Sequence, residues 1–173
     1  MDNSFFAYIQ QLELLAFFSG YPLLYATVML LTGKDHSKTY LKINLALLLP
    51  FAYALTGCLY LGLQLKNLYP NYSFDNIRLS IHQPFLFIWG LSSIFFLAPV
   101  LRKKIALSLL HSLVFFILLA KDLFLYAIKS TSYKHDVKNA MQIYSYSLIL
   151  NLAALIFIFF IALLLKKIKK HRG

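Results

Sequence analysis

Long uninterrupted blocks of apolar residues, separated by short polar clusters, constrain this chain more than any other feature of its sequence. A helix of roughly 20 apolar residues spans the hydrocarbon core of a bilayer, which is about 30 Å thick. Strands of a membrane barrel are about 10 residues long and alternate in polarity, and these blocks do neither. Only 13% of the residues are charged, whereas soluble domains average about 25%. The sequence therefore predicts an all-α integral membrane protein.

Five of these blocks are long enough to cross a bilayer once each. The expected spans are approximately residues 8–31, 43–65, 83–101, 105–128 and 142–165. The connections between the spans are too short to fold on their own. Residues 1–173 are therefore expected to form one transmembrane helical domain, a bundle of five helices.

The first predicted span contains a glycine and a proline close together, Gly20 and Pro22. This pair predicts a kink near the middle of the bilayer. A small residue at such a position also allows another helix to approach closely.

The Lys and Arg residues of the connecting segments predict the orientation, because cytoplasmic segments carry an excess of them. One side of the predicted bundle holds eleven: Lys34, Lys38, Lys42, Arg102, Lys103, Lys104, Lys166, Lys167, Lys169, Lys170 and Arg172. The other side holds five: Lys66, Arg78, Lys129, Lys134 and Lys138. We therefore expect the N-terminus outside and the C-terminus in the cytoplasm, in a plasma or inner membrane.

Ionisable residues inside membrane spans cost about 2.5–3.5 kcal/mol each on insertion scales, so they mark candidate sites. Glu13, His82, Lys121 and Asp122 are expected at similar depth, near the outer ends of their helices. They form a candidate intramembrane polar cluster, in which a pair such as Glu13 with Lys121 would lower the cost of burying both charges. The cluster is either a structural ion pair or a substrate or ion site, and the structural interpretation is favoured.

Two further polar residues, His111 and Asn151, are expected deeper in the bundle. His111 shares one helix face with Ser108, Asp122 and Tyr126, and this polar stripe should face the bundle interior. His111 could be a proton relay, a metal or haem ligand, or a neutral histidine bonded to a neighbouring helix. We favour the last, because a lone histidine is usually satisfied locally. Asn151 needs a hydrogen-bond partner.

The sequence contains no P-loop, zinc-protease or serine-hydrolase motif. Cys58 is the single cysteine, so no internal disulfide or CxxC motif can form. We expect no metal and no cofactor. The net charge of +11 marks a membrane face rather than a nucleic-acid surface, and the basic C-terminal tail should bind anionic lipids.

These features favour a non-catalytic subunit or assembly factor of a larger membrane complex, packed against other membrane subunits or further copies of itself. The alternative is a small oligomeric transporter or channel with an outward-facing vestibule made by Glu13, Lys121 and Asp122. A membrane enzyme acting on a lipid ranks last, because no nucleophile is placed beside the acidic residues.

Overall fold

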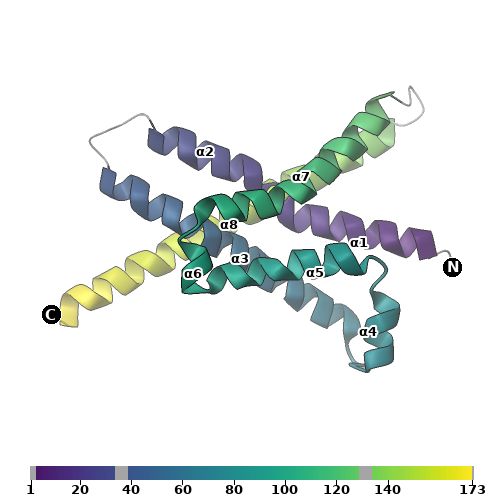
Figure 1. Ribbon diagram of the computed structural model, residues 1–173, viewed down its shortest axis with the longest axis horizontal. Helices are drawn as coiled ribbons and strands as arrows, with labels where there is room; N and C mark the ends of the chain where they lie inside the picture. The colour runs from purple at the N-terminus through teal and green to yellow at the C-terminus, as the bar shows by residue number, and fades with distance from the viewer. Residues whose placement is uncertain (1–2, 34–38, 129–133, 173) are drawn as a thin grey trace.

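The computed structural model describes residues 3–33, 39–128 and 134–172, and these residues contain helices and no strand. Figure 1 shows the two chain termini at opposite ends of the long axis. We call the end that carries α4 the α4 end and the other the C-terminal end. The elements in chain order are α1 (Asn3–Phe18), α2 (Tyr21–Gly33), α3 (Thr39–Leu68), α4 (Phe74–Ser80), α5 (Pro84–Ser92), η2 (Ser93–Leu97), α6 (Pro99–Arg102), α7 (Ile105–Ile128) and α8 (Lys134–Arg172).

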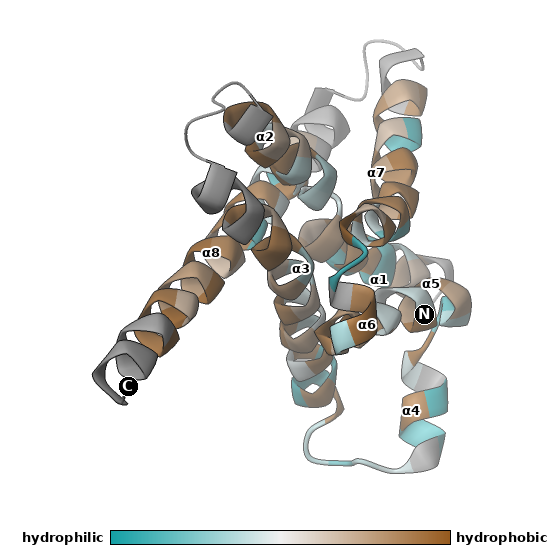
Figure 2. Cartoon of the chain, turned by 60° about the vertical axis from the view of Figure 1, so that its left-hand side comes forward, coloured by the Kyte–Doolittle hydropathy of each residue, from teal (hydrophilic) through white to brown (hydrophobic). Residues whose placement is uncertain are grey.

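Four stretches of the described chain are long and apolar enough to cross a membrane: Phe5–Leu31, Leu45–Leu68, Ile105–Leu125 and Met141–Leu165. They coincide with the first, second, fourth and fifth spans predicted from the sequence. Figure 2 shows apolar residues along α2, α3, α7 and α8, and hydrophilic residues in the loop before α4 and in α4 itself. The chain thus has the composition and helix lengths of a membrane protein.

The predicted third span, residues 83–101, is not one continuous helix. α5 passes into the 3-10 helix η2, and Pro99 then starts α6. Proline lacks an N–H and disfavours the helical conformation in the residue before it, and Ala98 is accordingly extended, with φ −64° and ψ 135°. The apolar stretch Pro84–Leu97 is shorter than the other four, so the count of five spans stays a prediction.

Two serines mark the change from α5 to η2. Ser92 Oγ donates to the carbonyl of Trp89 at 2.7 Å, and Ser93 Oγ donates to that of Gly90 at 2.6 Å. Such bonds compete with the regular helix ladder and often bend a helix. Ser93 also packs tightly on α3, because a Cβ added to Gly57 would overlap its Oγ.

The first span is broken in its middle. α1 ends at Phe18 and α2 begins at Tyr21, so the kink predicted from Gly20 and Pro22 is confirmed as a break between two helices. A break inside a membrane leaves backbone groups that no water can satisfy, and neighbouring helices must supply their partners.

α8 supplies those partners. Ser147 Oγ accepts a hydrogen bond from the Gly20 N–H at 2.8 Å, and Asn151 Nδ2 donates to the Phe17 carbonyl at 2.8 Å. The two backbones are in direct contact, because a Cβ added to Gly20 would lie 2.6 Å from the backbone nitrogen of Leu148. The break and α8 therefore fix one another in position.

The centre of the bundle is aromatic. Its largest fully buried side chains include Tyr21, Tyr53, Tyr60, Phe18 and Phe115. Phe18 stacks on Phe115 with ring centroids 4.9 Å apart, and meets Tyr53 and Tyr60 edge-on at 5.7 Å each. Helices in lipid associate through such close packing rather than through exclusion of water, so this cluster joins α1, α3 and α7.

The later helices are less covered than the earlier ones. In the most apolar parts of Phe5–Leu31 and Leu45–Leu68, 50% of the residues are buried. The corresponding fraction is 22% for Ile105–Leu125 and 17% for Met141–Leu165. α7 and α8 therefore present broad apolar faces that the described part of the chain leaves uncovered.

Replacing Gly20 with alanine should destabilise the protein by about 1–3 kcal/mol, because the added methyl group would overlap the backbone of α8. Unfolding in detergent micelles, followed by circular dichroism, measures the effect. Gly62→Ala is the matched control, since no atom of the described residues lies within 4 Å of a Cβ added there, and alanine favours a helix interior by up to about 1 kcal/mol. Equal stability of the two variants would contradict the direct contact between α1–α2 and α8.

Candidate functional site

The α4 end holds a hydrogen-bonded group of polar side chains built on two adjacent glutamines of α1. Gln10 Oε1 accepts hydrogen bonds from the backbone N–H groups of His82 at 2.9 Å and Gln83 at 2.8 Å. Gln11 Nε2 donates to Asp122 Oδ2 on α7 at 3.0 Å. α1 is thereby tied to the start of α5 on one side and to α7 on the other.

Glu13, on the next turn of α1, lies in a pocket of about 580 Å³ between α1, the end of α3 and α4. Its Oε2 accepts a hydrogen bond from Gln64 Nε2 on α3 at 3.0 Å. The other polar side chains that line this pocket, which we call the α4 pocket, are Gln10, Asn67, Asn71, Asn76, Ser80 and His82.

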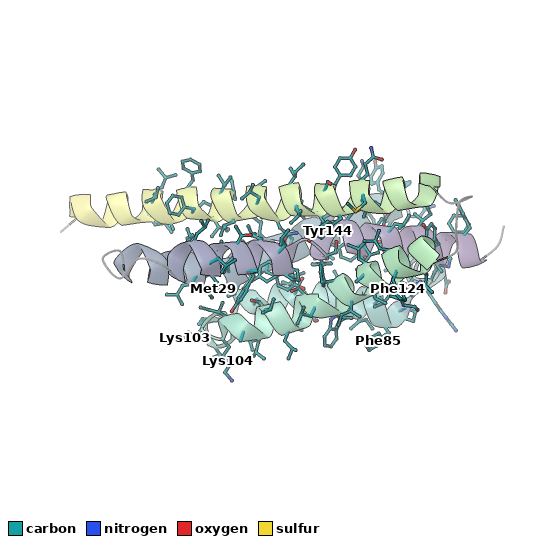
Figure 3. All side chains as sticks on the ribbon, turned by 90° about the horizontal axis from the view of Figure 1, so that it is seen from above. Met29, Phe85, Lys103, Lys104, Phe124 and Tyr144 are labelled. Atoms are coloured by element: carbon teal, nitrogen blue, oxygen red, sulfur yellow. The ribbon has the colours of Figure 1, made fainter. Side chains whose placement is uncertain are left out.

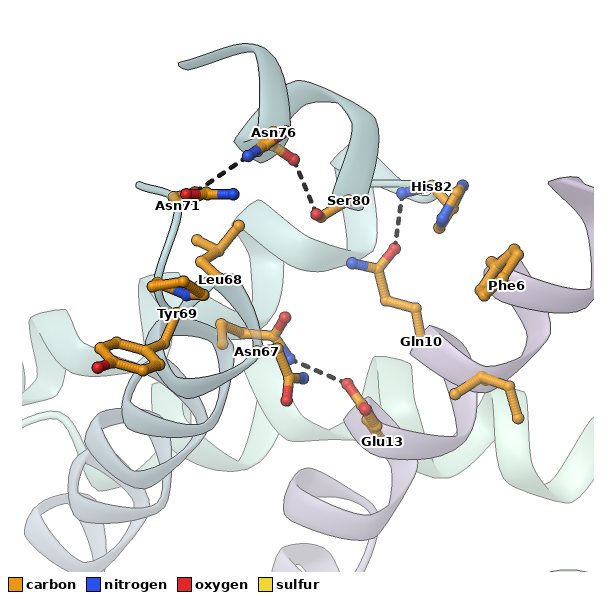
Figure 4. A pocket seen from close by; sticks show the side chains of 13 residues that line it. Phe6, Gln10, Glu13, Asn67, Leu68, Tyr69, Asn71, Asn76, Ser80 and His82 are labelled. Atoms are coloured by element: carbon orange, nitrogen blue, oxygen red, sulfur yellow. Dashed lines mark hydrogen bonds between the residues drawn. The ribbon is translucent and has the colours of Figure 1, made fainter. Parts of the chain in front are cut away.

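Figure 4 shows Gln10 reaching from α1 towards His82, and Glu13 facing the end of α3. On the far side of the α4 pocket, Asn76 Nδ2 donates to the Asn71 carbonyl at 3.2 Å. The ring of His82 stacks on Phe6, with centroids 5.4 Å apart. The rim is thus held by contacts between α1, α4 and the loops beside it.

The structure separates the four residues predicted to form one outer cluster. Glu13 and His82 line the α4 pocket, whereas Asp122 bonds to Gln11 and does not line it. Lys121 is exposed, and among the described residues no ion pair joins it to Glu13, which bonds to Gln64 instead. Consecutive helical residues point about 100° apart, so Lys121 is directed elsewhere when Asp122 faces α1.

His111 lies where α3, α5 and α7 meet. Its Nδ1 is 2.7 Å from the Tyr53 hydroxyl, and its Nε2 is 2.7 Å from the Ser92 hydroxyl. The indole of Trp89 stacks on the imidazole with centroids 4.7 Å apart and planes 3° apart. The Trp89 N–H also donates to the His111 carbonyl at 3.2 Å.

These bonds assign the tautomer of a neutral His111. The Ser92 hydroxyl donates its proton to the Trp89 carbonyl, so its oxygen accepts from Nε2–H. Nδ1 then accepts from the Tyr53 hydroxyl. Both ring nitrogens are engaged within the chain, which leaves no lone pair for a metal ion or haem and fits the locally bonded histidine favoured from the sequence.

Ser108, His111 and Asp122, three members of the predicted polar stripe on α7, each bond to another helix, as a face turned inward requires. Ser108 is buried and its hydroxyl is 2.7 Å from that of Tyr21 on α2. The side chain of Tyr126, the fourth member, lies outside the described residues.

Asn151 is buried at the break between α1 and α2. Its Nδ2 donates to the carbonyls of Phe17 and Ser147, both at 2.8 Å, while its Oδ1 has no hydrogen-bond partner among the described residues. The role that the structure gives Asn151 is that of a link between helices.

Several individual pairings in these sites were not predicted from the sequence. Gln64 is the partner of Glu13, and Tyr53 and Ser92 are the partners of His111. The amide of Gln64 in an otherwise apolar helix was an available signal. Tyrosine and serine are too common in such helices to stand out.

Within the described residues, no three His, Cys, Asp or Glu side chains lie close enough together to hold a metal ion. No family model, curated protein or solved structure matches the chain.

Replacing Tyr53 with phenylalanine should lower the free energy of unfolding by about 1–3 kcal/mol, because His111 Nδ1 would lose its hydrogen-bond donor inside the helix bundle. Tyr60→Phe on the same helix is the matched control. The Tyr60 hydroxyl is buried without a hydrogen-bond partner in the described part of the chain, so its removal should leave stability unchanged or raise it. Unfolding in detergent measures both variants. A larger loss for Tyr60→Phe would contradict the assigned bonds.

Proposed function

We propose that the chain is a non-catalytic subunit or assembly factor of a larger membrane complex. The observation that carries this proposal is that three of the candidate polar residues inside the helices, His111, Asp122 and Asn151, are engaged within the chain. Both nitrogens of His111, the Asp122 carboxylate and the Asn151 amide nitrogen all bond to neighbouring helices. Buried polar groups of this kind fix which helices pack together, and that is a structural task.

The partner surface in this proposal is the apolar face of α8. Only 17% of its membrane-spanning part is buried, and its exposed side chains include Leu152, Ile156, Phe157, Phe160, Leu163 and Leu164. Its partner is a helix of another membrane subunit or of a further copy of this chain, associating by close packing.

The proposal includes a single domain with five membrane crossings, the N-terminus outside and the C-terminus in the cytoplasm of a plasma or inner membrane. α5 with 9 residues and η2 with 5 together rise about 24 Å, at about 1.5 and 2 Å per residue. This is close to the bilayer thickness of about 30 Å, although α6, which follows the extended Ala98, turns away from the line of α5 and does not lengthen it (Figure 1). The opposite positions of the two termini in Figure 1 also support an odd number of crossings.

The positions of the basic residues support the same orientation. Lys103 and Lys104 are exposed at the turn between α6 and α7, as Figure 3 shows. The remaining basic residues of the predicted cytoplasmic side, including the C-terminal tail proposed to bind anionic lipids, have side chains outside the described residues.

The second candidate is a small oligomeric transporter or channel. The α4 pocket favours it, because Glu13 would lie in a vestibule at the outer end of the bundle. Lys121 and Asp122, the other proposed vestibule residues, do not line that pocket. In this function Asp122→Asn would abolish flux in reconstituted vesicles without preventing insertion, whereas in a subunit the same change would reduce only assembly or abundance.

Purification of the tagged chain from its native membrane, followed by mass spectrometry, should recover other membrane subunits or further copies at fixed stoichiometry. Phe160→Ala on α8 should reduce that recovery several-fold without changing the stability of the isolated chain. Phe95→Ala on η2 is the matched control, since both side chains are exposed, 59% and 67% respectively. Recovery of a lone chain that carries solute flux would instead favour the second candidate.

Reporters fused before Met1 and after Gly173 should lie on opposite faces of the membrane, the first outside and the second in the cytoplasm. Protease protection or cysteine labelling in intact cells measures their positions. Reporters on a shared face would mean an even number of crossings, with the segment from α5 to α6 entering the bilayer and returning.

A further inference from the structure

The α4 pocket has an unusual charge for this protein. The chain carries 17 Lys and Arg residues against 6 Asp and Glu. Among the described residues, the lining of the α4 pocket nevertheless contains Glu13 and no Lys or Arg, and His82 is its one basic side chain. A concave site with one carboxylate and no permanently charged cation of its own attracts a positively charged ligand.

Glu13 has capacity left for such a ligand. A carboxylate offers about four acceptor positions, and among the described residues Glu13 has one hydrogen-bond donor, Gln64 Nε2. Asn67, Asn71 and Asn76 also line the α4 pocket, and the side-chain amide of each carries an oxygen that can accept hydrogen bonds. A group with several N–H donors can therefore bond to the carboxylate and to neighbouring amides at once.

The rest of the lining is apolar and aromatic. Phe6, Ile9, Leu68 and Tyr69 belong to it. Aromatic faces attract organic cations, and aliphatic side chains suit the carbon skeleton that carries the charge. The volume of about 580 Å³ lies within the range of about 300–1,000 Å³ common for small-molecule sites.

We infer that the α4 pocket binds a primary organic ammonium group, with the Glu13 carboxylate as its counter-ion. A primary ammonium carries three donors, and the lining offers more hydrogen-bond acceptors than aromatic faces. The inference goes beyond both functions proposed above, because a subunit and a transporter could equally hold such a ligand.

Two sources would supply this group at a membrane surface: the ethanolamine headgroup of a phospholipid, or a free amine in solution. Lys66 on α3 and Arg78 on α4 are exposed and belong to the two elements that frame the α4 pocket, although neither lines it. Their cations suit the phosphate of a lipid headgroup, which sits next to the ammonium.

The first experiment uses the full chain in nanodiscs of phosphatidylcholine and phosphatidylglycerol, titrated with ethanolamine and with ethylene glycol, its uncharged analogue. Ligand binding is followed by NMR. Ethanolamine should bind at least about tenfold more tightly than ethylene glycol, which corresponds to about 1.4 kcal/mol. In a second arm, native mass spectrometry compares retention of phosphatidylethanolamine with that of phosphatidylcholine.

Glu13→Gln should weaken binding of the probe that binds the unmodified chain, ethanolamine or phosphatidylethanolamine, about tenfold. The substitution removes the charge of the side chain and preserves its shape and its contact with Gln64. Asp75→Asn is the matched control, since Asp75 is an exposed carboxylate on α4 that does not line the α4 pocket. Its binding should equal that of the unmodified chain.

Preferential retention of phosphatidylethanolamine alone would identify a lipid headgroup as the ligand. Binding of ethanolamine alone would identify a soluble amine, and either result supports the inference. Equal binding of ethanolamine and ethylene glycol with no lipid preference would overturn it. So would unchanged binding in Glu13→Gln. If that variant does not fold, the comparison of charged and uncharged probes on the unmodified chain decides the matter.

Discussion

Hydrocarbon offers no partner for a backbone amide or carbonyl, and this constraint governs how the chain is put together. The clearest case is the break between α1 and α2. Gly20 and Pro22 interrupt the helix, and the groups released there are paired by Ser147 and Asn151 of α8. A local feature near the beginning of the chain therefore dictates where its last helix lies. Gly20 and Ser147 are separated by 127 positions in the sequence, and Phe17 and Asn151 by 134, yet each pair is in contact.

The same constraint explains the surroundings of His111 and the polar group at the α4 end. An imidazole in this position needs a donor and an acceptor, and Tyr53 of α3 and Ser92 of α5 supply them. Gln10 and Gln11 do the equivalent for the start of α5 and for α7. α1, α5 and α7 are therefore joined by hydrogen bonds, and lipid could not compensate for the loss of these bonds. Glu13 stands apart, because its carboxylate has one hydrogen bond to the described part of the chain and lines the α4 pocket.

Sequence reasoning reached the helical class and four of the long helices, because apolar blocks of this length have few alternatives in water or in lipid. It also anticipated the break at Gly20, since glycine and proline act through the local backbone. It did not anticipate the division of residues 83–101. The hydroxyls of Ser92 and Ser93 bond to carbonyls of their own helix, but from the sequence they could equally have bonded to another helix. The partners of Glu13 and His111 depend on the rotation of α3 relative to α1 and α7, and composition does not encode that rotation.

The stacking of Trp89 on His111 gives the molecule a built-in optical probe. Trp89 is the only tryptophan in the chain, and its ring lies against the imidazole at the meeting point of α3, α5 and α7. Its fluorescence therefore reports on one place only, the seating of α5 against its neighbours. Separation of these helices, whether through unfolding or through a rearrangement within the bilayer, would change the emission without any attached dye.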